Sequence, residues 1–202
     1  LVVQVVQCGI CGSDLGFLAQ GGLMGPGKPL AIGHELWGVV HEVGANVTHV
    51  DLGAKVVVQP IANDNLIGNG GPDGGFSPYM LVRNAANSPG SILTMPAVLP
   101  DNYGALVEPL SVAQHSANRV GADATDKAVI FGAGTIGLSL LLLLQHRQLQ
   151  DIVVIDLSDR RLDSAAALGA HVLRADDPEL TAKLIKLHGS ASLFGMPMPG
   201  ST

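Results

Sequence analysis

Cysteine is scarce in this chain. Only two of its 202 residues are cysteine, and both lie near the start, at Cys8 and Cys11. Two thiols this close in an extended segment cannot form a comfortable bridge, and they cannot supply the disulfide framework of a small secreted domain. The sequence therefore predicts a reducing, cytoplasmic location in which both thiols are available for other chemistry.

Charge and long apolar runs are also scarce. Charged residues make up 14% of the chain, the formal net charge is -6, and no basic block occurs, so we expect neither a nucleic-acid partner nor an anionic membrane surface. The longest apolar run, 136–144, is too short to cross a bilayer, and no basic-then-apolar signal segment opens the chain. With 26 glycines and 47% hydrophobic residues, the composition predicts a soluble, loop-rich enzyme domain.

The first part of the chain, from Leu1 to about Asn118, consists of short valine-rich runs separated by glycine and proline. Such runs are typical of β-strands with tight turns between them. Several short strands at close spacing predict a small, irregular β-barrel. The predicted strands are 1–7, 37–43, 55–59 and 79–82.

The second part, from about Lys127 onward, alternates strands with helices. A βαβαβα order predicts a parallel sheet with helices on its faces, the doubly wound Rossmann fold. We therefore predict an α/β protein with two domains, 1–118 and 119–202. The predicted elements are strands 127–131, 152–156 and 171–173 and helices 135–147, 160–168 and 178–188.

The alternation of strands and helices ends after His188, where glycine, serine, methionine and proline dominate. A six-stranded doubly wound sheet needs its second half at that point. We therefore expect the Rossmann domain to be incomplete in this sequence.

A glycine-rich turn follows the first strand of the second domain and has the form G-x-G-x-x-G. Because it stands between a predicted strand and a predicted helix, it indicates a loop that places a dinucleotide pyrophosphate on the helix N-terminus. The predicted cofactor-binding residues of this loop are Gly132, Gly134, Thr135, Ile136 and Gly137.

Asp156 ends the next predicted strand, where a carboxylate accepts hydrogen bonds from the adenosine ribose. Because such a carboxylate repels a 2′-phosphate, the sequence favours NAD over NADP. Arg160 and Arg161 follow closely. Arg161 is a candidate cofactor contact that would soften this preference, and the alternative is that both arginines are solvated residues of the next helix.

Four residues spread along the first domain have the side chains that hold a catalytic zinc ion. They are Cys11, His34, Glu35 and Glu108. Each is ambiguous alone. Cys8 and Cys11 could instead form a redox pair, but such a pair needs the start of a helix in a thioredoxin-like fold, and the surroundings here are predicted strand and loop. They could also form half of a structural zinc site, but that site needs a second pair of ligands nearby, and the sequence has none.

The remaining side chains of these types have simpler interpretations. Cys8 is interpreted as a small core residue of its strand, since free cysteine is commonly buried. The other histidines are interpreted as surface residues or as hydrogen-bonded core residues. They are His41, His49, His115, His146, His171 and His188.

The motifs together resemble the zinc-containing medium-chain alcohol dehydrogenases. The segments 6–14, 32–44 and 107–113 and the glycine loop at 132–137 occur in the order of that family. The resemblance extends from Leu1 to about Leu187 and is strongest to the polyol (sorbitol-like) and secondary-alcohol branches. It implies a GroES-like irregular β-barrel that carries the zinc, followed by a Rossmann domain, with the active site in the cleft between them.

The resemblance also implies roles for individual residues. Cys11 and His34 match the zinc ligands. Glu35 matches a carboxylate that ligates zinc in polyol dehydrogenases, and Glu108 matches either a further ligand or a carboxylate bridged to zinc by water. Two more residues are implied in catalysis. Asp14 matches the acid that lies behind the zinc histidine, and Ser13 matches the hydroxyl that takes the substrate proton.

The sequence departs from the family in three ways. A histidine usually ends a proton relay two residues beyond Asp14, where this chain has Gly16. Many members carry a four-cysteine structural zinc lobe, but the segment 61–72 has no cysteine, so we expect a single catalytic zinc and no structural one. Third, the family's first strands and the second half of its Rossmann domain have no counterpart in this sequence.

We therefore predict a zinc- and NAD(P)-dependent alcohol or polyol dehydrogenase that transfers a hydride from a secondary alcohol to NAD and gives the ketone. The loop 17–29 is expected to line part of the substrate pocket, and the resemblance implies a homodimer or homotetramer. Two alternatives stay open at this point, a zinc-free quinone or enoyl reductase on the same scaffold and a non-catalytic NAD-binding fragment.

Overall fold

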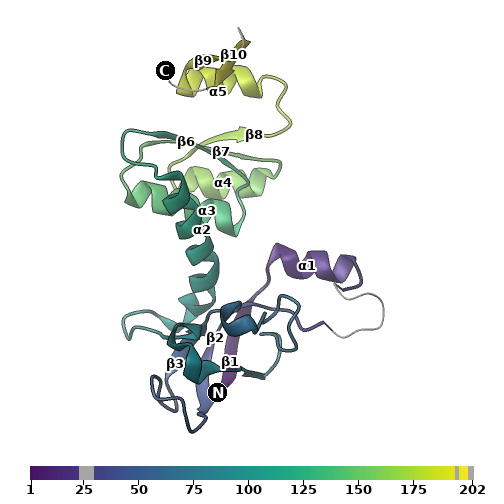
Figure 1. Ribbon diagram of the computed structural model, residues 1–202. Helices are drawn as coiled ribbons and strands as arrows, with labels where there is room; N and C mark the ends of the chain where they lie inside the picture. The colour runs from purple at the N-terminus through teal and green to yellow at the C-terminus, as the bar shows by residue number, and fades with distance from the viewer. Residues whose placement is uncertain (23–29, 194–195, 200–202) are drawn as a thin grey trace. The chain divides into compact units, whose positions relative to one another are not determined.

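The computed structural model describes residues 1–22, 30–193 and 196–199 and divides into two compact units, Leu1–Glu108 and Pro109–Thr202 (Figure 1). The division falls near the start of helix α2 (Val107–Val120). The boundary predicted after residue 118 lies near the other end of the same helix and stays a prediction. Within the predicted pocket loop 17–29, residues 23–29 lie outside the described residues.

The first unit is built on a five-stranded antiparallel sheet in the order β4-β1-β2-β3-β5. Four of these strands were predicted, and the short β5 was not. The sheet confirms the expected barrel-type first domain. The strands are β1 (Val2–Gly9), β2 (Glu35–Glu42), β3 (Lys55–Val58), β4 (Tyr79–Leu81) and β5 (Ile92–Thr94).

Alternate residues of these strands point to two separate cores, as expected for extended chain. Val40 and Val56 pack with Met80 on one side of the sheet. Trp37 and Val57, which are paired across β2 and β3, pack on the other side with a smaller cluster. Both clusters are buried, so the first unit has its own hydrophobic interior.

Two helices that precede β6 in the chain, where β6 is the strand Lys127–Phe131, were not predicted from the sequence. Helix α1 (Gly12–Ala19) follows β1 directly, and α2 follows a 3-10 segment at Asp101–Leu106. Both carry residues that usually interrupt helices, with Gly16 in the middle of α1 and Pro109 in the first turn of α2. Proline is tolerated in a first turn because the backbone N–H groups there have no partner within the helix.

The second unit contains a three-stranded parallel sheet in the order β6-β7-β8. Strands and helices alternate as predicted, with ends shifted by no more than two residues, so the Rossmann-type prediction is confirmed. A hairpin of β9 (Ser190–Leu193) and β10 (Met196–Pro199) follows and was not predicted. The main elements are β6 (Lys127–Phe131), α3 (Thr135–His146), β7 (Asp151–Asp156), α4 (Asp159–Ala167), β8 (His171–Arg174) and α5 (Leu180–His188).

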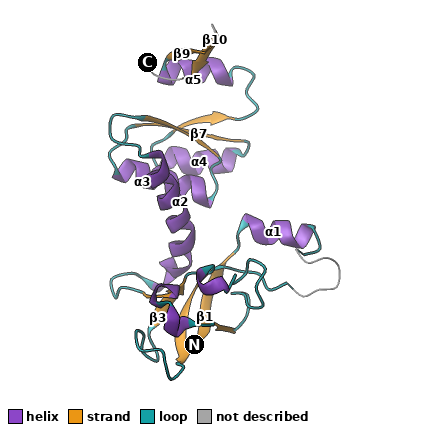
Figure 2. Cartoon of the chain, in the orientation of Figure 1, coloured by secondary structure: helices purple, strands orange, loops and turns teal. Residues whose placement is uncertain are grey.

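Helices cover this sheet from both sides (Figure 2). Ile152 and Val154 of β7 pack in one cluster with residues of α3 and α4, whereas Val153 and Ile155 pack on the opposite face with Leu184 of α5. This two-sided burial explains why β7 reads as an uninterrupted apolar run.

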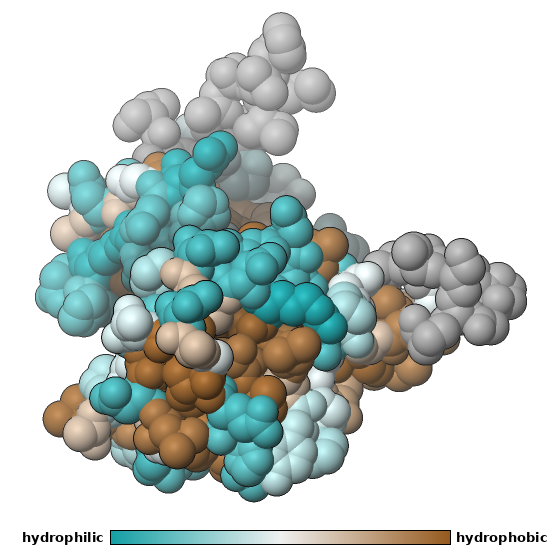
Figure 3. Space-filling model, turned by 60° about the horizontal axis from the view of Figure 1, so that its bottom comes forward, coloured by the Kyte–Doolittle hydropathy of each residue, from teal (hydrophilic) through white to brown (hydrophobic). Residues whose placement is uncertain are grey.

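Apolar side chains also reach the surface, and Figure 3 shows many of them gathered on one face. In the first unit they include Leu52, Leu93 and Val98, with Val98 almost fully exposed. Within the described ranges, no helix is long and apolar enough to cross a membrane.

Candidate functional site

Three predicted ligands meet at the end of β1. One ligand atom from each of Cys11, His34 and Glu35 lies within 4.8 Å of the other two. Cys11 follows β1, while His34 and Glu35 stand where β2 begins, and β1 and β2 pair directly with Gly9 opposite Glu35. Strand pairing therefore joins residues that are more than twenty positions apart in sequence. His34 and Glu35 are both buried.

Glycine at two positions makes room for this arrangement. A Cβ atom at Gly9 would stand 2.3 Å from Oε2 of Glu35, so any larger residue there would displace the carboxylate. Gly33, directly before His34, has a φ of +89°, a backbone conformation that L side chains rarely adopt. The sequence did not identify Gly9, because its role depends on the strand partner and on nothing in its own neighbourhood.

Asp14 is fully buried behind the three ligands, at 1% exposure. Its Oδ2 accepts a hydrogen bond from the backbone N–H of Cys11 at 2.8 Å, and its Oδ1 accepts one from the N–H of Gly33 at 2.9 Å. Oδ1 also lies 3.8 Å from Nδ1 of His34. The carboxylate therefore fixes the backbone beside both Cys11 and His34, in addition to lying next to the imidazole.

The residues present fit a zinc ion. A thiolate, an imidazole and a carboxylate form a donor set that zinc accepts, and three protein ligands leave a position for substrate or water. Nδ1 of His34 is buried and has no hydrogen-bond partner among the described residues. Oδ1 of Asp14 lies 3.8 Å from this nitrogen, so the imidazole stands beside a carboxylate, and a metal ion held by the other ring nitrogen would fix the orientation of the ring.

Glu108 and Ser13 lie near the ligand group of Cys11, His34 and Glu35 and are not part of it. Glu108 stands in the first turn of α2, and burial raises the pKa of its carboxyl, while the charge of His34 lowers it and that of Glu35 raises it. These effects indicate that Glu108 lies close to two of the ligands. Oγ of Ser13 is buried and has no hydrogen-bond partner within the described ranges.

Cys8 stays outside the ligand group. Its Sγ fills space beside Gly33 and Gly75, where an added Cβ would come within 3.0 Å and 2.7 Å of the sulfur. Burial raises the pKa of the thiol to about 12, with a further contribution from Asp14. A half-buried thiol that remains protonated at neutral pH is a poor metal ligand, which agrees with a place at the edge of the core.

The interpretation of the remaining histidines was wrong in two cases. Nε2 of His49 and Nε2 of His188 are buried without a hydrogen-bond partner in the described part of the chain. His188 is itself buried at the end of α5. Burial of a histidine cannot be inferred from sequence alone, since it depends on what packs over the helix end.

The glycine loop has the conformation that its sequence predicts. Gly132 has a φ of +101°, and the N–H of Gly132 donates to the carbonyl of Ile155 at 2.7 Å. A Cβ at Gly137 would stand 1.8 Å from the Gly132 carbonyl oxygen, so only glycine allows this close packing. Nothing lies within 4 Å of a Cβ built at Gly134, where α3 begins, so the loop is open at the helix N-terminus.

Asp156 connects this loop to the next one. Its Oδ2 accepts a hydrogen bond from the N–H of Ala133 at 2.7 Å, and its Oδ1 accepts one from the N–H of Ser158 at 2.8 Å. These bonds lower the pKa of the Asp156 carboxyl, and Arg161, whose Nη1 lies 3.8 Å from Oδ2, lowers it further. The ribose role predicted for Asp156 is not tested by these contacts, which add a second role in positioning the loop.

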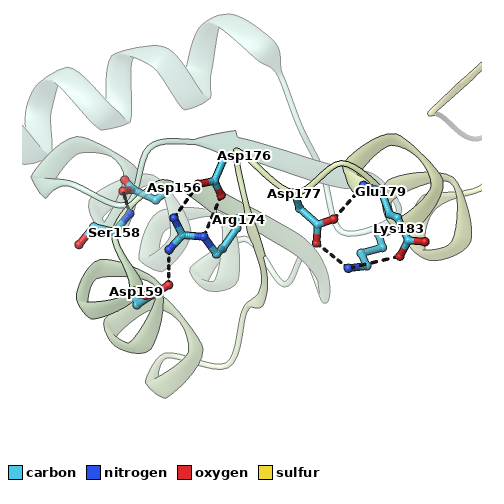
Figure 4. Close-up of polar contacts among 8 residues, drawn as sticks. All are labelled: Asp156, Ser158, Asp159, Arg174, Asp176, Asp177, Glu179 and Lys183. Atoms are coloured by element: carbon cyan, nitrogen blue, oxygen red, sulfur yellow. Dashed lines mark hydrogen bonds and ion pairs between the residues drawn. The ribbon is translucent and has the colours of Figure 1, made fainter.

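Arg174 is a cation beside Asp156 that was missed in the sequence. The two residues pair in register at the ends of β7 and β8. Figure 4 shows the Arg174 guanidinium held between Asp159 and Asp176, and the bonds to Asp176 measure 2.8 Å. Hydrogen bonds to Arg174 lower the pKa of the Asp176 carboxyl. This guanidinium is therefore already neutralised by two carboxylates of its own chain.

Comparison with known proteins identifies the same two units. Residues 1–90 match the alcohol dehydrogenase GroES-like domain, and residues 128–183 match the TrkA-N domain. The chain is 33% identical over 215 residues to (R,R)-butanediol dehydrogenase of Neisseria gonorrhoeae and 33% identical over 195 residues to human sorbitol dehydrogenase. Among solved structures, a zinc-dependent alcohol dehydrogenase of Streptococcus pneumoniae superposes with a TM-score of 0.77 at 26% identity.

These matches cover most of this chain and only part of each relative. They include 92% of the chain and 59% of the butanediol dehydrogenase, and 86% of the chain and 52% of the sorbitol dehydrogenase. For the Streptococcus structure the shares are 94% of the chain and 59% of the solved protein. The chain therefore spans a little over half the length of the relatives it matches.

Proposed function

Because this chain belongs to the zinc-containing medium-chain alcohol dehydrogenase family, we propose that it contributes the metal centre and the dinucleotide loop of an enzyme that oxidises a secondary alcohol or polyol. The reaction transfers a hydride from the substrate carbon to NAD and gives the ketone. The observation that supports this proposal best is the grouping of Cys11, His34 and Glu35 within 4.8 Å.

A bound zinc ion would act as a Lewis acid toward the substrate oxygen and lower the pKa of the substrate hydroxyl. The chain's own residues would do the rest. Cys11 and His34 would hold the ion together with Glu35 or Glu108. The hydroxyl of Ser13, which has no hydrogen-bond partner among the described residues, would take the substrate's hydroxyl proton while its own proton passes to water or to the cofactor ribose. Asp14 keeps the ligands in place through its bonds to Cys11 and Gly33.

For the cofactor we propose NAD in preference to NADP. The glycine loop opens at the N-terminus of α3, where unpaired N–H groups and the helix dipole favour a pyrophosphate. Asp156 stands at the end of β7 with its charge retained, which disfavours a 2′-phosphate. Nη1 of Arg161, on α4, lies 3.8 Å from Oδ2 of Asp156, so Arg161 would be the cation that weakens this preference. The cytoplasmic location and the homodimer or homotetramer stay predictions.

The metal assignment is tested by two cysteine variants. Cys11→Ser should abolish zinc retention, while Cys8→Ser should leave the zinc content unchanged because Cys8 packs outside the ligand group. Metal content of the purified proteins, measured by mass spectrometry after dialysis, distinguishes the two. Zinc loss in Cys8→Ser with retention in Cys11→Ser would show that the wrong cysteine was assigned.

The substrate class is tested by supplying polyols, simple secondary alcohols, hydroxy acids and threonine together with NAD. NADH formation that depends on zinc supports the proposal. NAD binding without oxidation of any alcohol would indicate a cofactor-binding protein instead. A zinc-free reductase is disfavoured by the relatives, which are butanediol and sorbitol dehydrogenases.

A further inference from the structure

Arg174 stands at the carboxyl end of β8, beside the position proposed for the adenosine ribose. It pairs in register with Asp156 of β7, and register partners of a parallel pair project to the same face of the sheet. Its side chain is 40% exposed, so the guanidinium is open to a ligand from solution. An arginine near the ribose carboxylate can accommodate a 2′-phosphate in a dinucleotide site. Arg174 therefore has the place and the chemistry of a 2′-phosphate ligand.

Two carboxylates occupy this guanidinium. Nε and Nη2 of Arg174 donate to the two carboxylate oxygens of Asp176 at 2.8 Å each, and Nη1 donates to Oδ1 of Asp159 (Figure 4). The paired bonds to Asp176 use the same planar fork that binds two oxygens of a phosphate. Asp159 opens α4, and Asp176 follows the end of β8, so two segments hold the guanidinium. These three residues form the Arg174 clamp.

The charge around the proposed ribose position is negative. Ion pairs join the residues of the Arg174 clamp to one another and join Asp156 to Arg161. These five residues carry three carboxylates and two guanidinium groups. Hydrogen bonds lower the pKa of the Asp156 and Asp176 carboxyls, so both are ionised at neutral pH. A 2′-phosphate that enters this group of residues therefore meets a net negative charge.

We propose that Asp159 and Asp176 enforce selectivity for NAD by withholding Arg174 from a 2′-phosphate. Asp156 repels that phosphate directly, and the Arg174 clamp removes a cation that would otherwise compensate for the repulsion. Asp159 and Asp176 are thus positioning residues that act through Arg174 and need not touch the cofactor. This inference rests on the proposed NAD site and goes beyond it by assigning the selectivity to two further carboxylates.

The test compares two adenosine nucleotides that differ by a 2′-phosphate, 5′-AMP and adenosine 2′,5′-bisphosphate. Titration calorimetry measures their binding to the full 202-residue chain, and neither probe requires zinc, nicotinamide or turnover. In the double variant Asp159→Asn/Asp176→Asn, the Kd for the bisphosphate should fall about tenfold, the usual contribution of one charge-assisted hydrogen bond. The Kd for 5′-AMP should stay unchanged. The gain should diminish at high ionic strength, which screens exposed charges.

Asp177→Asn/Glu179→Gln is the matched control. It removes two carboxylates from the neighbouring cation Lys183, changes the net charge by the same amount and leaves the Arg174 clamp intact (Figure 4). The control should show no gain for the bisphosphate. Adding Arg174→Gln to the double variant should cancel its gain, because the cation that takes the phosphate is then absent. Exposed ion pairs contribute little to stability, so all variants should stay folded, which circular dichroism checks.

Three outcomes would overturn the proposal. An equal gain in the control would show that overall charge alone sets the preference. A gain that survives Arg174→Gln would assign the phosphate to another cation, such as Arg161. Binding of 5′-AMP with no gain for the bisphosphate in the double variant would show that the carboxylates do not withhold Arg174. Failure of the unchanged chain to bind 5′-AMP would instead reject the proposed dinucleotide site, and the role of the Arg174 clamp with it.

Discussion

At the scale of single residues, the position of the Glu35 carboxylate depends on a glycine in the neighbouring strand. A Cβ at residue 9 would stand 2.3 Å from Oε2 of Glu35. We predict that Gly9→Ala displaces the carboxylate and weakens zinc binding on the order of tenfold, the lower end of the effect of losing a residue that supports a metal ligand. Competition with a chromogenic chelator measures the zinc affinity.

Gly16→Ala is the matched control for this variant. It adds the same methyl group to α1, where nothing lies within 4 Å of the new Cβ atom. The control should keep its zinc affinity. If Gly9→Ala bound zinc as tightly as the control, Glu35 would not be a direct ligand, and Glu108 would become the carboxylate to test.

Asp156 combines two roles that a substitution can separate. We predict that Asp156→Asn weakens NAD binding by about tenfold, because an amide cannot accept from both Ala133 and Ser158 with the strength of a carboxylate. NADP binding should fall less, because loss of the charge also removes the repulsion of the 2′-phosphate. Titration calorimetry with each cofactor measures the effect.

Rescue by Asp156→Glu separates the two roles further. Glutamate keeps the charge and moves it outward, so it should restore discrimination against NADP better than it restores overall affinity. A result in which Asp156→Asn changes only the ratio of NAD to NADP affinity would mean that the bonds to Ala133 and Ser158 do not position the loop.

The sequence could predict which residue types form the metal group, and it could not predict what supports them. Cys11, His34 and Glu35 have recognisable ligand chemistry, so they could be selected before their proximity was known. Gly9 and the two backbone bonds of Asp14 depend on the pairing of β1 with β2, which no local pattern encodes. Arg174 was missed because its neighbours Asp156 and Asp159 belong to a different strand and helix.

At the scale of elements, the strands and helices from β6 to α5 were predictable because their apolar periodicity agrees with their burial. Helices α1 and α2 were not, since Gly16 and Pro109 break the patterns that indicate helices. In α2 the proline lies in the first turn, where tertiary context and a preceding 3-10 segment determine the helix start.

Helix α5 ends on a histidine that should make the second unit sensitive to acid. Burial lowers the pKa of His188 below 6.5, and Lys127 and His171 lower it further, while Asp151 acts in the opposite direction. The folded state therefore binds this proton less readily than the unfolded state. Stability is retained above pH 6.5 and is lost as the pH falls from 6.5 toward the folded-state pKa.

We predict that His188→Phe reduces the loss of stability between pH 7.5 and 5, because the buried group that must take up a proton is removed. Urea unfolding followed by circular dichroism at both pH values measures it. His146→Gln, at an exposed position at the end of α3, should keep the pH dependence of the unchanged chain. Equal pH dependence in all three proteins would exclude His188 as the source.

At the scale of the whole molecule, each unit has its own hydrophobic interior. Of the four core clusters found among the described residues, two lie wholly within 1–108 and two within 109–202. The zinc ligands belong to the first unit, and the glycine loop and Asp156 belong to the second. Each ligand should therefore stabilise the unit that binds it.

We predict two unfolding transitions with different ligand responses. A ligand at a hundredfold excess over its Kd stabilises its unit by about 2.7 kcal/mol, so zinc should raise the midpoint of the first unit and NAD that of the second. The single tryptophan, Trp37, is buried in the first unit, so its fluorescence reports that unit alone, while circular dichroism reports both. Zinc should shift the midpoint of the fluorescence change. NAD should shift only the part of the circular dichroism change that is not accompanied by a fluorescence change, because that part reports the second unit. If NAD moved the Trp37 transition as far as zinc does, the units would unfold as one, and the separate cores would not act as separate sources of stability.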